Sequence, residues 1–214
     1  IFETVFRRPM RTFIALDLPD PVKQLVVARQ QVLERALRAQ TLAGCVRWTT
    51  RQNLHLTLRF LGDTTPAEFK TVDTALAGIT AQQLTFSLHL HTEGVFPNYH
   101  RPNILWIDFG GERQSLETLQ EMIEVAVRAA GFAPGERPFK PHLTIGRMQR
   151  SARPGDISRI GTVLQQMTVT HHFNPSREGS FSVEEVQFIQ SDLQPDGPVY
   201  TPLSIHRFGG MTTL

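Results

Sequence analysis

Cysteine is almost absent from this chain of 214 residues, in which Cys45 is the only one. One cysteine cannot form a disulfide within the chain, nor can it build a metal site from several thiolates. The sequence is therefore not that of a small disulfide-stabilised protein. With 40% hydrophobic and 20% charged residues, its composition is that of a globular protein able to bury a substantial core.

Long apolar runs are also missing. No stretch approaches the roughly 20 residues that cross a bilayer, and residues 1–10 lack the apolar segment of a signal peptide. The sequence holds neither a Gly-x-Gly-x-x-Gly fingerprint nor a Walker phosphate loop. We therefore expect a cytoplasmic protein without a membrane segment, and we assign no cofactor.

Lysine is scarce as well. Of the 22 basic residues, 19 are arginine and 3 are lysine, while the formal net charge is only +2. Arginine makes bidentate contacts to phosphate and stacks on nucleobases, so this bias is compatible with a nucleic-acid ligand. A GC-rich genome would produce the same bias. The 20 acidic residues exclude a strongly cationic coating protein.

The most informative feature that is present is a tetrapeptide pattern that occurs twice. His55–Leu58 and His142–Ile145 both read His, apolar, Thr, apolar. Alternation with a period of two predicts a β-strand in which the His and the Thr of each copy lie on one face. Two such strands side by side would surround a small anion with two imidazoles and two hydroxyls. These groups are an acid, a base and hydrogen-bond donors, which cleavage of a phosphodiester without a metal requires.

One copy of this pattern would carry little weight, because a partly exposed strand with a hydrogen-bonded histidine is common. The surroundings of the two copies, however, are alike. Residues 12–17 and 104–109 read as strands, and each is followed by a turn and an amphipathic stretch, at 22–39 and 114–130. The repeated order of strand, helix and His-x-Thr strand predicts an α+β fold with two similar lobes that meet at a shared cleft.

Periodicity and turn residues predict the other elements. In the helical stretch 22–39, Asp20 is the expected cap, and Arg29, Arg35 and Arg38 are expected on the solvent side. The remaining expected elements are a helix over 66–79, strands over 46–49, 84–90, 181–190 and 200–208, a loop over 96–103 and, within a connecting segment at 150–175, a short helix over 157–167.

Several segments together resemble one known family. They are residues 11–19, 46–48, 53–62, 94–97, 105–106, 139–147 and 191–193, with Gly197 and Tyr200. Over about residues 11–208 the chain is similar to the 2H phosphoesterase superfamily, and within it to the bacterial and archaeal RNA 2′,3′-cyclic phosphodiesterases, also called 2′-5′ RNA ligases. The resemblance implies that residues 1–214 form one domain of two pseudo-symmetric lobes. Each lobe would be an antiparallel sheet with helices outside, with strands exchanged between the lobes.

The resemblance also implies an activity, which is metal-independent hydrolysis of a terminal 2′,3′-cyclic phosphate on RNA to a 2′-phosphate, with weak, reversible 2′-5′ RNA ligation. It assigns His55 as the proton donor to the leaving ribose oxygen and His142 as the acceptor of a proton from water. The residues alone leave this choice open, because the two motifs are nearly identical. Thr57 and Thr144 would donate hydrogen bonds to the non-bridging phosphate oxygens.

Two arginines are expected to bind the substrate. The family places an arginine at Arg147 against the phosphate, but simple alternation would point Arg147 away from its motif. A strand end or bulge at Gly146 is therefore required. Arg59 alternates onto the face of the first motif, where a solvated charge at the end of a strand is an equal alternative.

Other patterns carry less information. Trp48, Phe96 and Tyr99 are candidates for stacking on nucleobases, although packing is the commoner role of such residues. The His-x-His pair at 89 and 91 and the pair at 171–172 have no further ligand at a convincing spacing, so we assign no metal.

Two other functions fit the same residues. A non-catalytic RNA- or nucleotide-binding protein would use the cleft, but it would not need both imidazoles. A phosphodiesterase acting on another small substrate, such as a nucleotide cyclic phosphate or a 2′-5′ oligonucleotide, would need the same groups. The expected partner is an RNA end or oligonucleotide with a 2′,3′-cyclic phosphate, and we expect a monomer.

Overall fold

The computed structural model describes residues 9–135, 137–169, 173, 179–195 and 197–209. The elements along the chain are β1 Met10–Asp17, α1 Asp20–Ala39, β2 Val46–Trp48, the 3-10 turn η2 Arg51–Asn53, β3 His55–Thr64, α2 Pro66–Gln82, β4 Phe86–Phe96, β5 Ile104–Gly111, α3 Arg113–Ala129, β6 Leu143–Met148, α4 Pro154–Val169, β7 Ser180–Val183, β8 Glu185–Gln194 and β9 Gly197–Arg207.

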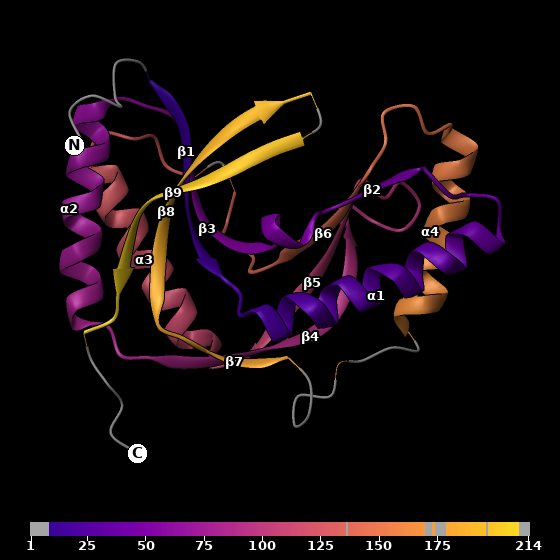
Figure 1. Ribbon diagram of the computed structural model, residues 1–214, viewed down its shortest axis with the longest axis horizontal. Helices are drawn as coiled ribbons and strands as arrows, with labels where there is room; N and C mark the ends of the chain where they lie inside the picture. The colour runs from indigo at the N-terminus through magenta and orange to yellow at the C-terminus, as the bar shows by residue number, and fades with distance from the viewer. Residues whose placement is uncertain (1–8, 136, 170–172, 174–178, 196, 210–214) are drawn as a thin grey trace.

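The described strands form one curled sheet in the order β7-β4-β5-β6-β3-β1-β8-β9. In addition, β2 pairs with the C-terminal half of β6. Every pairing in the sheet is antiparallel. Two groups of elements separate in space (Figure 1). The first lobe holds β1, β3, β8 and β9 with α2 and α3, and the second holds β2, β4, β5 and β6 with α1 and α4. The expected α+β fold with two antiparallel lobes is confirmed.

The two repeats exchange elements in a symmetric way. β4 ends the first repeat and pairs with β5, which begins the second. In the same way β8 ends the second repeat and pairs with β1, which begins the first. The helices follow this exchange, because α1 packs on α4 and α2 packs on α3. Each lobe therefore contains pieces of both repeats and is incomplete without the other half of the chain.

One face of the sheet and the inner sides of the helices form the main core. Ile14, Leu56, Leu105 and Leu143 from the strands are at most 2% exposed and belong to one apolar cluster with residues of all four described helices, such as Val26. The alternation in β3 and β6 leaves every second side chain on the opposite face. That face carries the polar residues of both motifs.

α1 differs from the expectation in two respects. It begins at Asp20 after Pro19, and Asp20 makes no cap hydrogen bond but forms an ion pair with Arg51 at 3.1 Å. Arg29 does not face solvent: its side chain is 6% exposed and forms a bidentate ion pair with Glu93 of β4, with Nε–Oε1 at 2.5 Å and Nη2–Oε2 at 2.8 Å. The spacing of apolar residues in a helix cannot reveal a buried acidic partner from a distant strand.

Three boundaries also differ. The expected strand over 181–190 is two strands, β7 and β8, and the short helix expected over 157–167 extends over Pro154–Val169 as α4. β4 continues to Phe96 instead of ending near residue 90, because its far half pairs with β5 up to Ile104. The connecting segment at 150–175 therefore contributes a full helix to the second lobe.

Replacing Arg29 by Met should lower the free energy of unfolding by roughly 3 kcal/mol, because the Glu93 carboxylate then stays buried without that arginine. Chemical denaturation measures the effect. The double variant Arg29→Met/Glu93→Leu removes both charges and should recover most of the loss. A single variant as stable as the wild type, or a double variant less stable than the single one, would contradict this account of the lobe.

Candidate active site

The two His-x-Thr motifs meet where the two lobes join. β3 and β6 are paired through the second residue of each motif, Leu56 opposite Leu143. In an antiparallel pair this register sets the histidine of each motif opposite the threonine of the other. The two leucines are buried in the core, and the four polar residues are half-buried on the opposite face. The structure therefore brings together the four residues that alternation predicted, His55, Thr57, His142 and Thr144.

Both histidine rings are oriented by the same kind of hydrogen bond. Nδ1 of His55 lies 2.8 Å from the carbonyl oxygen of Asn53, and Nδ1 of His142 lies 2.7 Å from the carbonyl oxygen of Lys140. A carbonyl only accepts, so we assign the proton of each neutral ring to Nδ1. Nε2 is then the basic nitrogen of each ring. In the first motif, Nε2 of His55 lies 3.0 Å from the hydroxyl of Thr57.

Aromatic side chains enclose His55. The ring centroid of Phe13 is 4.8 Å away and that of Tyr200 is 5.1 Å away, with the tyrosine edge-on. Burial lowers the pKa of His55 from 6.5 to about 4, although the carbonyl of Asn53 and the carboxylate of Asp17 act in the opposite direction. In the substrate-free protein His55 is therefore neutral at pH 7.

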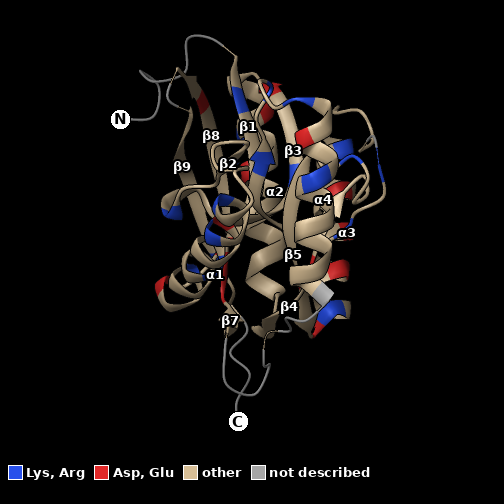
Figure 2. Cartoon of the chain, turned by 90° about the vertical axis from the view of Figure 1, so that its right-hand side faces the viewer, with Lys and Arg blue, Asp and Glu red and all other residues tan. Residues whose placement is uncertain are grey.

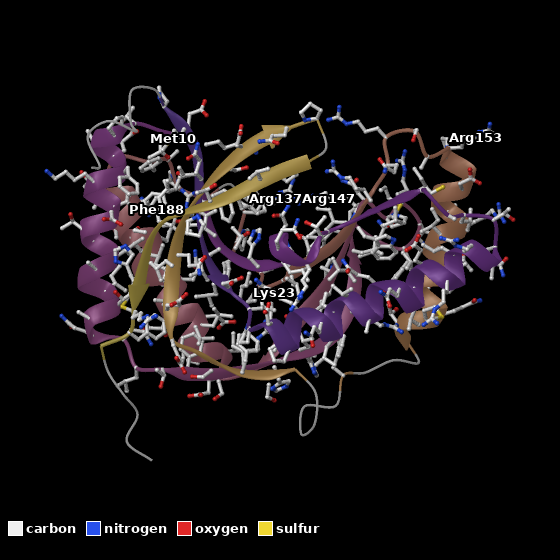
Figure 3. All side chains as sticks on the ribbon, in the orientation of Figure 1. Met10, Lys23, Arg137, Arg147, Arg153 and Phe188 are labelled. Carbon is white, nitrogen blue, oxygen red and sulfur yellow. The ribbon has the colours of Figure 1, made fainter. Side chains whose placement is uncertain are left out.

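A buried lysine lies close to the same histidine. Lys23, near the start of α1 (Figure 3), is 8% exposed and forms an ion pair with Asp17 at 2.6 Å. Asp17 is the partner of His55 in the pairing of β1 with β3. The carboxylate raises the pKa of His55 and the ammonium lowers it, so the two charges oppose each other and burial remains the dominant cause.

The second histidine has a different neighbour. Phe96 is the last residue of β4. Its ring is edge-on to the ring of His142, with the two centroids 5.3 Å apart, and its centroid is 5.1 Å from that of Trp106 of β5. Of the aromatic residues proposed for base stacking, Phe96 therefore lies at the site. Trp48 packs against the core, and the hydroxyl of Tyr99 is 2.9 Å from that of Thr168.

Arg147 lies on the same face as the motif residues because β6 is irregular. β6 pairs with β5 through Thr144–Trp106 and through Arg147–Ile104. Ile104 and Trp106 are two residues apart on β5 and share a face, so Arg147 shares the face of Thr144 although it lies three positions further along β6. An irregularity is therefore present beside Gly146, where Ile145 is left out of the register with β5. Arg147 lies between the two lobes (Figure 3), and its contact with phosphate stays a prediction.

Sequence reasoning missed two further arginines and a tyrosine at this place. Arg47 of β2 is paired with Arg147. Burial raises the pKa of the Tyr200 phenol, while Arg147, Arg11 and Arg47 act on it in the opposite direction, so all three guanidinium groups lie near this phenol. No ion pair involves these three arginines in the part of the chain that the structure describes. Residues 46–48 belong to the segments that carry the family resemblance, but that resemblance assigned no role to Arg47.

Charge elsewhere on the surface is mixed. On the side of the molecule shown in Figure 2, basic and acidic positions are interspersed. The three arginines around Tyr200 are therefore a local concentration of positive charge, not part of a uniformly basic surface.

Arg59 is not brought together with the motif residues. Its Nε forms an ion pair with Glu124 of α3 at 2.5 Å, and its other nitrogens donate to the carbonyl oxygens of Phe60 and Ala133. The register of β3 on β1 shifts between Thr57 and Arg59, which interrupts the alternation used to place this side chain. The geometry therefore favours a structural role that joins β3 to α3.

The remaining sequence patterns add no second site. His89 and His91 have ring centroids 6.1 Å apart, and within the described ranges no group of three His, Cys, Asp or Glu could hold a metal. The pair at 171–172 lies outside the described residues. Among the described helices, none combines the length and the apolar composition that crossing a bilayer needs.

Known proteins are similar to this chain in sequence and fold. The chain is 28% identical over 198 residues, covering 92% of it and 98% of the relative, to an RNA 2′,3′-cyclic phosphodiesterase of Methanothermobacter thermautotrophicus. It is 29% identical over 181 residues, covering 84% of it and 91% of the relative, to the protein of the same name from Aquifex aeolicus.

Solved structures agree with these relatives. LigT of E. coli in complex with 3′-AMP has a TM-score of 0.70 at 23% identity, covering 94% of this chain and 99% of LigT, and so supports the fold alone. A protein of Thermus thermophilus has a TM-score of 0.68 at 26% identity over the same shares. A family model described as the 2′-5′ RNA ligase superfamily matches residues 19–195, which include both motifs. This chain, with its paired His-x-Thr strands, belongs to the 2′-5′ RNA ligase superfamily.

Proposed function

We propose that the protein hydrolyses 2′,3′-cyclic phosphate ends of RNA to 2′-phosphates by metal-independent acid–base catalysis. The observation that carries this proposal is the pair of histidines, each fixed through Nδ1 by a backbone carbonyl and each opposite the threonine of the other motif. The names of the curated relatives support the choice of substrate.

In the proposed reaction, Nε2 of His142 takes a proton from water as the water oxygen attacks phosphorus. The bond between phosphorus and O3′ breaks, and Nε2–H of His55 gives its proton to O3′. The product carries a 2′-phosphate and a 3′-hydroxyl. Thr57 and Thr144 donate hydrogen bonds to the non-bridging oxygens, and Arg147 balances the charge that grows there.

The acid role of His55 depends on the substrate. In the free protein its pKa is about 4, and its neutral Nε2 accepts a hydrogen bond from the Thr57 hydroxyl. The anionic phosphodiester, bound beside this nitrogen, favours the protonated ring and raises the pKa. The Thr57 hydroxyl then turns from the histidine to a phosphate oxygen. With a 5′-hydroxyl in place of water as the nucleophile, the same groups would form a 2′-5′ linkage as the bond to O3′ breaks, weakly because water is abundant.

We expect purified protein to convert a short RNA with a 2′,3′-cyclic phosphate end to the 2′-phosphate, with undiminished rate in excess EDTA. His55→Ala and His142→Ala should each slow the reaction by roughly 10²–10⁴-fold, the usual contribution of a general acid or base. Phosphorus NMR identifies the product, and circular dichroism checks that the variants fold. A predominantly 3′-phosphate product, or a near wild-type rate in either variant, would contradict the proposal.

A substrate whose leaving group needs no proton should separate the two roles. With a nucleoside 2′-(4-nitrophenyl phosphate), the leaving nitrophenolate is stable as an anion. His55→Ala should therefore recover most of its lost rate on this ester relative to the cyclic phosphate, whereas His142→Ala should remain slow. Release of nitrophenolate is followed by absorbance. Recovery in His142→Ala instead would exchange the acid and base assignments.

The low pKa of His55 also predicts how stability depends on pH. As the pH falls from about 6.5 to about 4, His55 is protonated in the unfolded chain but stays neutral in the folded protein. The free energy of unfolding therefore decreases over this pH range. His55→Gln should abolish this loss, on the order of 2 kcal/mol by pH 4. Chemical denaturation of both proteins at a series of pH values measures it. A stability difference between variant and wild type that stays constant with pH would exclude a buried neutral imidazole at this position.

A further inference from the structure

A cavity lies at the outer end of the second lobe, and neither His55 nor His142 lines it. Its volume is about 340 Å³, and it opens between the loop that joins β4 to β5, the segment after β6 and the first turn of α4. Among the side chains that line it are His100, Arg101, Gln149 and Arg150. Part of one wall belongs to the connecting segment at 150–175, for which the sequence predicted no function.

The walls of this cavity are tied together. Asn103 donates its backbone N–H to the carbonyl of Phe96 at 2.7 Å and accepts from the N–H of Met148 at 2.9 Å, which joins the loop to β6. The loop also lies against α4 at Gly161, where an added Cβ would be only 1.7 Å from the carbonyl oxygen of Tyr99. The absence of a side chain at Gly161 therefore lets the helix approach closely enough to form the wall.

The lining is positively charged. It carries the guanidinium groups of Arg101 and Arg150 and the imidazole of His100, and no carboxylate is among the lining residues. Within the described ranges neither arginine forms an ion pair, and both are exposed. Asp156, in the first turn of α4, is directed to Arg159 at 3.4 Å. Two unpaired arginines around a concave site are suited to bind a phosphate group.

β6 connects this cavity to the histidines. Thr144 lies at the catalytic end of the strand, and Arg147 and its partner Arg47 follow on the same face. Met148, the last residue of β6, lies on the opposite face and lines the cavity, so the cavity is reached by passing the end of the strand. At roughly 3.3 Å per residue, Thr144 and Met148 are on the order of 12 Å apart. In Figure 3, Arg147 lies between the lobes, and Arg153, just before α4, lies further out on the same upper side. A mononucleotide whose phosphate is held at the histidines is too short to reach the cavity, whereas a short single strand is long enough.

We propose that this cavity binds a phosphate of the RNA strand upstream of the cyclic end, so that the protein prefers oligonucleotides over mononucleotides. This inference rests on the proposed function. The cyclic phosphate lies at the histidines, and the preceding nucleotides follow β6 over Arg147 and Arg47. An internucleotide phosphate then lies between Arg101 and Arg150.

The test compares a nucleoside 2′,3′-cyclic monophosphate with a tetranucleotide that carries the same cyclic end. The wild type should have a higher kcat/KM on the tetranucleotide. Arg101→Ala/Arg150→Ala should lose about 10-fold on the tetranucleotide and less than twofold on the mononucleotide. Lys70→Ala/Arg128→Ala, with the same loss of charge on exposed residues of α2 and α3, is the matched control and should retain the preference.

Binding is measured separately, by the fluorescence anisotropy of a labelled tetranucleotide with a 3′-phosphate at several salt concentrations. Loss of this one phosphate contact should make the slope of log Kd against log salt shallower by about 0.7 in Arg101→Ala/Arg150→Ala, since each neutralised phosphate on a single strand contributes about 0.7. Equal losses on both substrates, or an unchanged salt slope, would overturn the inference and leave the proposed function intact. If the wild type hydrolyses neither substrate, the proposed function fails, and the salt slope still decides whether the cavity binds the strand.

Discussion

The pairing of Leu56 with Leu143 is the constraint on which the site depends. It is the only register pair between the described strands β3 and β6, and it joins two otherwise separate sets of strands. Because the paired residues occupy the same position in each motif, the strands are related by a local two-fold axis that passes between them. That symmetry sets each histidine opposite the other motif's threonine. A slip of one residue in either strand would turn its histidine towards the core.

A single register pair between β3 and β6 is not enough to hold the two lobes together. The exchange of elements between the repeats provides further contacts between them. β4 and β8 each end one repeat by pairing with the first strand of the other. α1 adds a polar link, because the side-chain amide of Gln30 donates to the carbonyls of Thr49 and Ile145, both at 2.8 Å. The bond to Ile145 lies within the second motif, so a helix of the first repeat fixes the strand that carries His142.

The sequence was sufficient for the features that depend on local alternation. The shared face of His and Thr in each motif, the repeat and the main helices follow from the spacing of apolar residues. The features that could not be predicted depend on distant partners or on bulges. Arg59 was misplaced because the register on β1 shifts beside it, whereas the need for an irregularity was recognised for Arg147. The burial of Arg29 against Glu93 and of His55 against Phe13 involves residues from distant parts of the sequence.

The same distant contacts explain why two nearly identical motifs differ in their surroundings. Their backbones anchor the histidines alike, through a carbonyl two residues before each ring. The aromatic neighbours are not alike, because Tyr200 comes from β9, which adds a long outer strand beside β8. At the equivalent edge of the second lobe, beside β4, the short β7 is the only strand among the residues that the structure describes. A strictly symmetric protein would hold two equivalent imidazoles with no reason for one to donate and the other to accept. The final hairpin encloses one ring only, and so it makes the environments of the two histidines different, a difference on which the proposed division into an acid and a base depends.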